Sequence, residues 1–236
     1  GMDVQIHEPD VSPVQVQGPK SVLVIESLFG TKIASLPYYS LAETRLGQIP
    51  LVVTRTGWSG EYGFEVFLQG SEYGSQLWDR IMDAGKPHGI VAAGPSDIRR
   101  VEAGILGYGS DIDLNTNPFE AGMERLLDLD SDRIFIGKDA LCAIREAGVK
   151  RRIVGVELGG EELQSGSFTE PWPVLDNGQI GEILVALYSP RLEKNIGFAM
   201  VEIGYANLGT SMIVPGPDGE RVATVVEKPF VKSVRT

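Results

Sequence analysis

The sequence is poor in the residues that build covalent or metal-bound frameworks, with one cysteine and two histidines among 236 residues. The lone Cys142 excludes a disulfide framework and favours a reducing compartment, so a cytoplasmic location is predicted. It lies in the apolar run ALCAI, residues 140–144, which indicates a small core residue rather than a nucleophile. No Cys or His spacing typical of a metal site is present, and we expect no bound metal.

Positive charge is also scarce, with 21 Lys and Arg against 32 Asp and Glu and a net charge of −11. Nucleic acids and anionic membrane surfaces bind clustered Lys and Arg, so neither is expected as a partner. No apolar run reaches the length of a membrane-spanning helix. We expect no signal peptide either, and Gly1 before Met2 indicates the remnant of a purification tag.

A hydrophobic fraction of 42% can build a sizeable core in one or two domains. Up to residue 93, strand and helix periods alternate. The expected elements are a strand at 14–17, a helix at 19–29, a strand-like stretch at 36–46, hairpin strands at 51–56 and 62–69, a helix at 71–84 capped by Ser71, and a short strand at 90–93. The apolar stripe expected on the second helix is Tyr73, Leu77, Trp78, Ile81 and Met82. This order predicts a ferredoxin-like split βαβ unit with an added strand.

From residue 94 the pattern changes. Helices are expected at 95–103 and 137–147, with a loop-rich path between them, and Arg99 and Glu102 stand three apart so that they can pair. Short strands punctuated by turn residues follow, at 153–158, 179–187, 197–201, 211–214 and 222–226. They predict a small antiparallel β-barrel, and the whole chain is therefore assigned to the α+β class.

The hairpin at 51–69 has an unusual centre. Its second strand places Tyr62, Phe64 and Val66 on one face and Glu65 in mid-strand on the other. The carboxylate is then either on a solvated face of an ordinary hairpin or held in a polar pocket. Glycines at 57, 60 and 63 permit positive φ or a close approach of the backbone to another group.

The hairpin motifs GWSGE (57–61) and GFEV (63–66) resemble the folate-site hairpin of the aminomethyltransferase family, which includes the glycine-cleavage T-protein and tetrahydrofolate-dependent demethylases. Further blocks follow in the family's order: GPSDIRRVEAG (94–104), YGSDI (108–112), NPFEAG (117–122), FIGKDAL (135–141) and SPRLEKNIG (189–197). Five blocks in register over nearly the whole chain make the resemblance specific.

The resemblance implies tetrahydrofolate as the cofactor and a one-carbon transfer, of an aminomethyl or a methyl group, from a small donor. It implies that Glu65 clamps the pterin, because a carboxylate accepts two parallel hydrogen bonds from adjacent N–H donors. Trp58 is implied to line the cavity, where it would meet a methylated cation by cation–π attraction; a core plug beside a turn is the alternative. Tyr108 and Asp111 are implied to shape the folate cavity, and no catalytic residue is assigned.

The chain also departs from the family's pattern. Ser96 stands where the T-proteins have a folate-contacting arginine, which puts aminomethyl transfer from glycine in doubt. The QGPK block (17–20) comes almost at once, so the chain resembles only the C-terminal two-thirds of the family. We therefore expect a folate-site domain at 1–93, the remainder of a partly missing central folate-binding domain at 94–150, and a barrel domain at 151–236.

Three functional hypotheses follow from the resemblance. The chain is a tetrahydrofolate-dependent one-carbon transferase, a non-catalytic folate-binding module, or a subunit or fragment that completes another chain. The short N-terminal part and the apolar surface that it would leave exposed favour a homodimer or a partner chain supplying the missing segment. The family's iron–sulfur-assembly relatives carry a cysteine block where this chain has IGKD (136–139), which counts against the second hypothesis.

Overall fold

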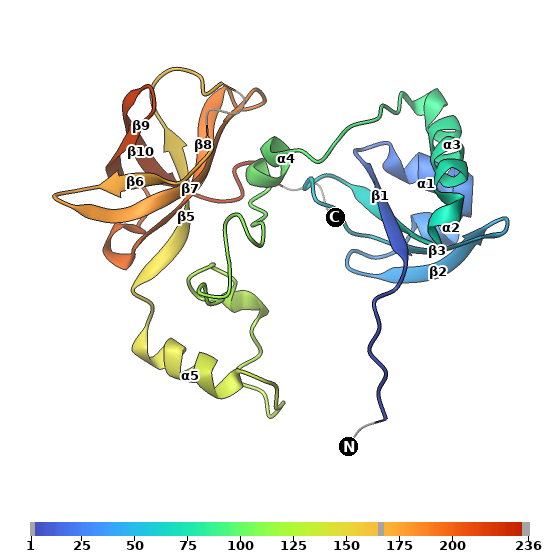
Figure 1. Cartoon of the computed structure of the whole chain (residues 1–236), viewed down its shortest axis with the longest axis horizontal. Coiled ribbons are helices and arrows are strands. Elements are labelled where there is room, and N and C mark those ends of the chain that lie inside the picture. The colour runs from blue at the N-terminus through green and yellow to red at the C-terminus, as the bar shows by residue number, and fades with distance from the viewer. Residues whose placement is uncertain (1–2, 165–167, 233–236) are drawn as a thin grey trace. The chain divides into compact units, whose positions relative to one another are not determined.

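The computed structural model describes residues 3–164 and 168–232, which divide into two compact units. The first unit extends to Ser96 and the second covers Asp97–Lys232 (Figure 1). Within the described residues, no helix has both the length and the apolar character required to cross a membrane.

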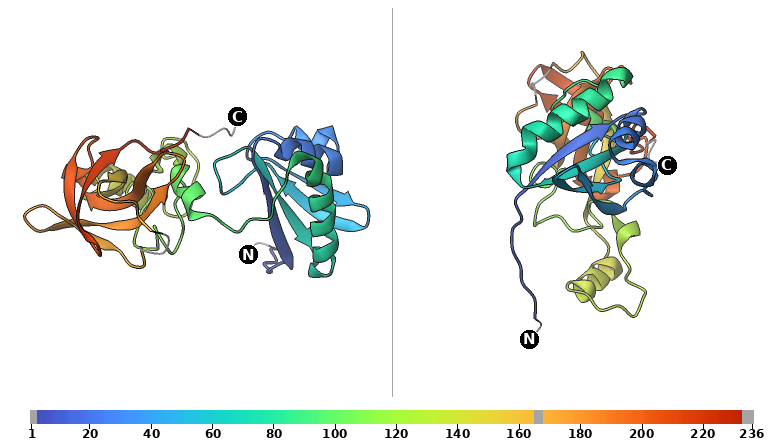
Figure 2. Two further views of the ribbon diagram at one scale, coloured as in Figure 1. Left: turned by 90° about the horizontal axis from the view of Figure 1, so that it is seen from above. Right: turned by 90° about the vertical axis from the view of Figure 1, so that its right-hand side faces the viewer.

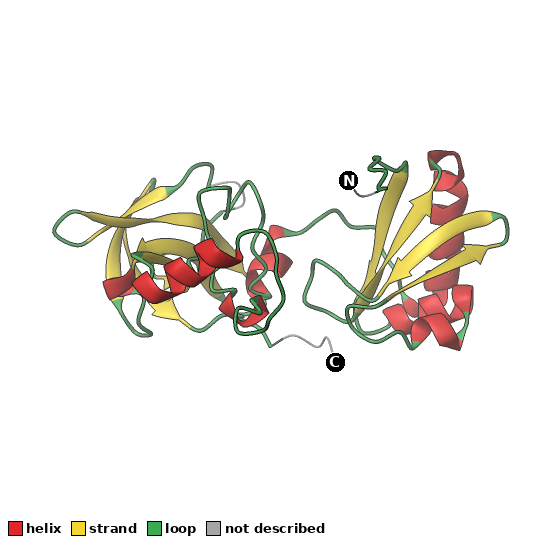
Figure 3. Ribbon diagram, turned by 90° about the horizontal axis from the view of Figure 1, so that it is seen from below, coloured by secondary structure: helices red, strands yellow, loops and turns green. Residues whose placement is uncertain are grey.

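The first unit is an antiparallel sheet covered by helices on one face (Figure 3). Its strands are β1 (Val11–Gln17), β2 (Leu41–Leu46), β3 (Ile49–Thr54) and β4 (Gly63–Gln69), in the order β1-β4-β3-β2. Its helices are α1 (Ser21–Phe29), α2 (Thr31–Ala34) and α3 (Gly74–Gly85), with short 3-10 turns at Ser71–Tyr73 and Lys86–His88.

Strand alternation explains which face of this sheet is covered. Val53, Phe64 and Val66 are fully buried and pack with Ile25 of α1 and Leu77 of α3 in one core cluster. The residues between them in β3 and β4 are only half-buried and lie on the face without helices. The sheet therefore has an apolar side covered by helices and an open side, on which the polar row at Glu65 neighbours apolar residues such as Val52 and Phe67.

The predicted strand at 90–93 is wrong, and this changes the expected split βαβ topology. Ile90 packs against Gly85, where an added Cβ would lie 2.5 Å from its side chain, whereas Val91 is 78% exposed. The run thus supplies one apolar anchor and continues as an extended connection. The strands joined through α1 are β1 and β2. In the order β1-β4-β3-β2 they form the two edges of the sheet, and they run antiparallel to each other.

Three smaller expectations in this unit also differ from the structure. Residues 36–40 form a turn before β2 rather than part of a strand, Trp78 is exposed instead of lying in the buried stripe, and Ser71 does not cap α3. Ser71 lies in the 3-10 turn that precedes α3, and its hydroxyl donates to Asp10 at 3.3 Å instead.

The second unit is built around the predicted antiparallel β-barrel, which is closed and has six strands. Its strands are β5 (Arg151–Leu158), β6 (Trp172–Leu175), β7 (Gln179–Ser189), β8 (Lys194–Glu202), β9 (Ser211–Gly216) and β10 (Gly219–Val226), closing in the order β10-β5-β8-β7-β6-β9. β6 was not predicted from the sequence, because it is only four residues long and contains Pro173. The α+β class is confirmed.

A helical and loop-rich segment precedes the barrel. It contains α4 (Asp97–Glu102) and α5 (Lys138–Ala147), with a 3-10 turn at Glu124–Leu126 between them. Val101 of α4 is fully buried in a cluster with Ile196 and Phe198 of the barrel. Arg99 and Glu102 form the predicted ion pair at 3.3 Å. The helix predicted at 95–103 is shorter than expected, because α4 covers only Asp97–Glu102.

Candidate functional site

Glu65 occupies the centre of a polar row on the open face of the first sheet. In the strand register it is paired with Gln15 of β1 on one side and with Thr54 of β3 on the other. Directly paired residues of antiparallel strands project their side chains from the same face. The prediction that Glu65 lies opposite Phe64 and Val66 is confirmed, and the side chain is half-buried rather than fully solvated.

A chain of two hydroxyls fixes one side of the Glu65 carboxylate. Thr56 Oγ1 donates a short hydrogen bond to Glu65 Oε2, and Thr54 Oγ1 lies 2.5 Å from Thr56 Oγ1. A hydroxyl carries one proton, so Thr54 donates to Thr56 while Thr56 donates to the carboxylate. In the part of the chain that the structure describes, no donor is found for the second oxygen, Oε1. That oxygen remains available as an acceptor.

Gln17, at the end of β1, hydrogen-bonds to the loop from β3 to β4. Its Nε2 donates to the carbonyl oxygens of Thr56 and Phe64, both at 3.2 Å, and its Oε1 accepts from the Ser59 hydroxyl at 2.8 Å. A Cβ on Gly57 would lie 2.2 Å from the Gln17 carboxamide, and one on Gly63 would lie 2.4 Å away. These two glycines therefore admit Gln17 rather than a ligand.

Arg55 braces the same loop from the helix-covered side. It is 2% exposed, its guanidinium lies 3.4 Å from the centroid of the Tyr62 ring, and its Nη1 donates to the Gly63 carbonyl at 3.0 Å. A desolvated guanidinium over a tyrosine ring is a strong contact. Neither Arg55 nor Thr56 was predicted from the sequence to belong to the site. Extending the strand alternation past Thr54 would have placed Thr56 on the face of Glu65.

Trp58 lies in the turn of this loop with 39% of its surface exposed. Its backbone N–H donates to Gln15 Oε1 at 3.3 Å, which ties it to the row containing Glu65. The exposure does not fit a core plug. It leaves the indole accessible beside the open face.

Tyr108 and Asp111 lie in the second unit, and they differ in their exposure to solvent. Tyr108 is 70% exposed. The Asp111 carboxylate is buried and accepts from Arg100 Nη1 at 2.5 Å and from the Gly107 N–H at 2.7 Å. Burial alone would lower the pKa of Arg100, but hydrogen bonds to Asp97 and Asp111 raise it above its usual value. Asp111 thus anchors a turn to α4, and a contact with folate stays a prediction for both residues.

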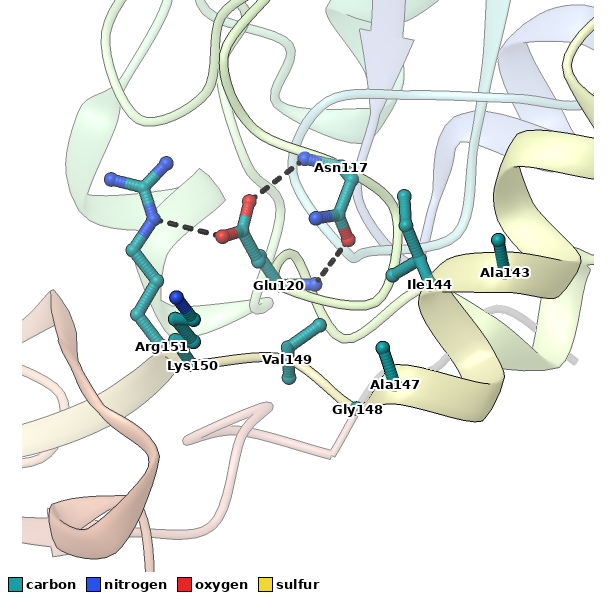
Figure 4. Close-up of a pocket in the computed structure, with 9 residues that line it drawn as sticks. All are labelled: Asn117, Glu120, Ala143, Ile144, Ala147, Gly148, Val149, Lys150 and Arg151. Carbon is teal, nitrogen blue, oxygen red and sulfur yellow. Dashed lines mark hydrogen bonds and ion pairs between the residues drawn. The ribbon is translucent and has the colours of Figure 1, made fainter.

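A pocket of about 480 Å³ also lies in the second unit, between the C-terminal half of α5 and the turn at 117–120 (Figure 4). The Glu120 carboxylate bridges its polar side, accepting from the Asn117 N–H at 3.0 Å and from Arg151 Nε at 2.9 Å. The opposite side is lined by Ala143, Ile144, Ala147 and Val149. This pocket was not predicted, because its walls come from segments about 30 residues apart and its polar residues have the sequence of an ordinary turn.

Comparison with known protein families agrees with this architecture. The family model described as the GCVT N-terminal domain matches residues 2–131, and the glycine cleavage T-protein C-terminal barrel domain matches residues 151–232. The chain belongs to the glycine-cleavage T-protein (aminomethyltransferase) family, and the predicted resemblance is confirmed.

Individual relatives show how much of the family's length is represented. The dimethylsulfoniopropionate demethylase of Ruegeria pomeroyi is 36% identical over 228 residues, covering 96% of this chain and 61% of the relative. The aminomethyltransferase of Thermotoga maritima is 36% identical over 230 residues, covering 94% and 60%. The chain thus spans about 60% of the length of these relatives.

A solved structure supports the fold. The glycine cleavage system aminomethyltransferase T of Bartonella henselae superposes with a TM-score of 0.77 at 20% sequence identity, over 95% of this chain and 60% of that one.

Proposed function

We propose that this chain takes part in tetrahydrofolate-dependent one-carbon transfer, of an aminomethyl or a methyl group, and that Glu65 is its pterin clamp. The observation that carries the proposal is the geometry of the Glu65 carboxylate, which is held by Thr56 through one oxygen and has the other oxygen available. A pterin presents an amino group and a ring N–H side by side, and a carboxylate with an available edge matches these donors.

The surrounding residues fit this role. Thr54 and Thr56 fix the rotamer of Glu65, so less conformational entropy is lost when the pterin binds. Gln17 and Arg55 hold the loop that carries Thr56. Because the row of Gln15, Glu65 and Thr54 lies on an open face of the first unit, these residues provide one wall of a folate site. Trp58, accessible beside that wall, provides an aromatic surface for a methylated cationic donor.

Relatives of both named activities, aminomethyltransferases and a demethylase, match this chain to a similar extent. This supports the reaction class and leaves the donor to be assigned by assay. A cytoplasmic location is part of the proposal. Cys142 is half-buried on α5, so the expectation of a core residue is wrong.

Calorimetric titration with tetrahydrofolate tests the clamp. Glu65→Gln keeps the side chain's size but places an NH2 group where an acceptor is needed. Loss of a charge-assisted hydrogen bond costs about 1.5–3 kcal/mol, so we expect the Kd to rise about 10-fold to 100-fold. Glu43→Gln is the matched control. Glu43 is paired with Val52 and so lies on the same face of the sheet as Glu65, and the substitution removes one negative charge from that face.

Circular dichroism should show that both variants keep the fold. An unchanged Kd in Glu65→Gln, or the absence of tetrahydrofolate binding by the unmodified chain, would overturn the proposal. Turnover with aminomethyl-lipoyl carrier, sulfonium and methoxy-aryl donors would then identify the one-carbon donor.

A further inference from the structure

The hairpin formed by β6 and β7 carries an asparagine–glycine pair at its tip. Asn177 precedes Gly178, and no other asparagine in the sequence precedes a glycine. Both residues are exposed, and Figures 1 and 2 show this hairpin extending outward from the barrel. The turn requires positive φ at both positions, 52° at Asn177 and 148° at Gly178, which explains why these residue types occupy it.

The backbone nitrogen of Gly178 is available as a nucleophile. Within residues 3–164 and 168–232, its N–H finds no hydrogen-bond acceptor, and the contact that closes the turn runs from the Asp176 N–H to the Gly178 carbonyl at 2.9 Å. An added Cβ on Gly178 would meet no atom within 4 Å. Because glycine has no side chain, this nitrogen is not crowded on the side of Asn177.

The side-chain amide of Asn177 is held only from its nitrogen. Nδ2 donates to Asp176 Oδ1 at 3.2 Å, and Asp176 Oδ2 accepts from the Tyr205 hydroxyl at 2.7 Å. An exposed hydrogen bond of this kind competes with water and adds little net stability. A local opening of the turn, which leaves the barrel core intact, is therefore sufficient to bring the Gly178 nitrogen to Asn177 Cγ.

The other asparagines each lack one of these features. Asn195 is buried in β8, and Asn117 precedes a proline, which has no N–H. Asn115 and Asn207 are exposed, but they precede threonine and leucine, whose side chains crowd the following nitrogen. The features that favour attack on a side-chain amide therefore come together at Asn177.

We propose that Asn177 is a site of spontaneous deamidation in the folded chain, with water as the co-reactant. The Gly178 nitrogen loses its proton to water and forms a bond to Asn177 Cγ. The bond from Cγ to Nδ2 then breaks, and ammonia leaves after taking a proton from water. Water opens the resulting succinimide ring. Hydrolysis at Cγ gives aspartate, and hydrolysis at the backbone carbonyl carbon gives isoaspartate, in which the main chain passes through the side chain.

The two products should differ in their effect on the barrel. Leu175 pairs with Gln179 across the turn, and isoaspartate would lengthen the main chain between them by one CH2 group. Turn length sets strand register in a hairpin. β6 reaches β9 through a single pair, Leu175 with Ile213, so a shifted register would weaken the closure of the barrel there. Aspartate tolerates the same φ as asparagine and adds only a negative charge.

Peptide mass spectrometry of the full 236-residue chain, incubated in neutral buffer, tests this proposal. The peptide containing Asn177 should gain about one dalton and separate into aspartate and isoaspartate forms. The rate should lie within tenfold of that of a synthetic peptide of residues 172–183, because the folded turn does not protect the site. Peptides containing Asn115 and Asn207 serve as exposed internal controls and should keep their mass over the same period.

Variants separate the reaction from its structural consequence. Asn177→Gln should abolish the mass gain, because a six-membered ring closes far more slowly, and Asn207→Gln is the matched control that should leave it unchanged. Hydrogen exchange in residues 172–175 should be at least tenfold faster in the isoaspartate fraction than in Asn177→Asp, which carries the charge without the extra CH2 group.

Three results would overturn the proposal. They are a rate in the folded chain more than tenfold below that of the peptide, a mass gain that persists in Asn177→Gln, and equal gains at positions 177 and 207. Because no folate is added, none of these outcomes bears on the Glu65 clamp.

Discussion

At the scale of single residues, the candidate site depends on a glutamine that touches no proposed ligand. Gln17 hydrogen-bonds to three positions of the 56–64 loop, and the two glycines beside it leave the space that its carboxamide fills. The position of Thr56, and through it the carboxylate of Glu65, follows from this packing. Gln17 is therefore a positioning residue for the loop.

A substitution at Gly57 tests this dependence. In Gly57→Ala the added Cβ would lie 2.2 Å from the Gln17 carboxamide, so the glutamine must leave and lose its hydrogen bonds. Moving a flexible carboxamide costs little by itself, so the expected cost is that of its hydrogen bonds, about 0.5–1.5 kcal/mol for each one lost. We expect urea denaturation to show a loss of that size in the unfolding free energy, and a smaller loss when Gly57→Ala is introduced into Gln17→Ala.

Gly74→Ala serves as the control for that experiment. Gly74 has φ of −55° at the start of α3, and an added Cβ would meet no atom within 4 Å, so the change should be neutral or slightly stabilising. Equal losses for Gly57→Ala in the presence and absence of Gln17 would show that the glutamine does not require the glycine.

At the scale of elements, period-2 alternation located β3 and β4, because about one side chain in two is buried along them. The barrel strands were found from the turn residues between them instead: β8 is buried at seven consecutive positions, and the short β6 was missed. The same alternation put Glu65 on the correct face. It could not separate the run at 90–93 from a strand, because four small apolar residues look alike whether one or all of them pack. It also could not show that Asp111 is paired with Arg100, since that pairing depends on how the 105–112 turn folds back on α4.

The segment after β10 is a second element that sequence patterns did not describe. Lys228 Nζ donates to the carbonyl of Ile153 at 3.2 Å, the Phe230 ring stacks on Phe198, and the Val231 N–H donates to the carbonyl of Glu102 at 2.9 Å. These contacts fasten the segment to the barrel and to α4. Burial, followed by the charge of Arg152, lowers the pKa of Lys228 to about 8.

This lowered pKa predicts a rise in stability with pH. Below pH 8 the lysine is charged in both states, and the folded state carries the cost of burying that charge. Between about pH 8 and the usual lysine value near 10.4 the unfolded chain binds a proton that the folded chain does not, so the unfolding free energy increases with pH. The total gain should be on the order of 2–3 kcal/mol.

Chemical denaturation from pH 7 to 10.5 would measure this increase in the unfolding free energy. The comparison is between the unmodified chain and Lys228→Met, which should lack the increase. Lys232→Met, at an exposed neighbouring lysine, is the control for the general loss of one positive charge. Parallel pH profiles for the unmodified chain and Lys228→Met would show that the burial of Lys228 has no energetic consequence.

At the scale of the whole molecule, each unit has its own core. The first packs its sheet against α1 and α3. The second fills its barrel, and Val101 of α4 packs against the outer face of the barrel strands, with Ile196 and Phe198 of β8. Separate cores of this kind predict that each unit unfolds cooperatively by itself. The three tryptophans allow this to be observed, because Trp58 and Trp78 lie in the first unit and Trp172 in the second.

In a Trp172→Phe background, tryptophan fluorescence reports the first unit alone. Phe64 and Phe198 are both fully buried, one in each unit, and replacing either by alanine costs about 3–5 kcal/mol. We expect Phe64→Ala to lower the midpoint of the fluorescence transition and Phe198→Ala to leave it in place, whereas far-ultraviolet circular dichroism should register both losses. A fluorescence midpoint that falls equally in the two variants would mean that the cores unfold as one cooperative unit, because destabilising the barrel would then destabilise the sheet that carries Glu65.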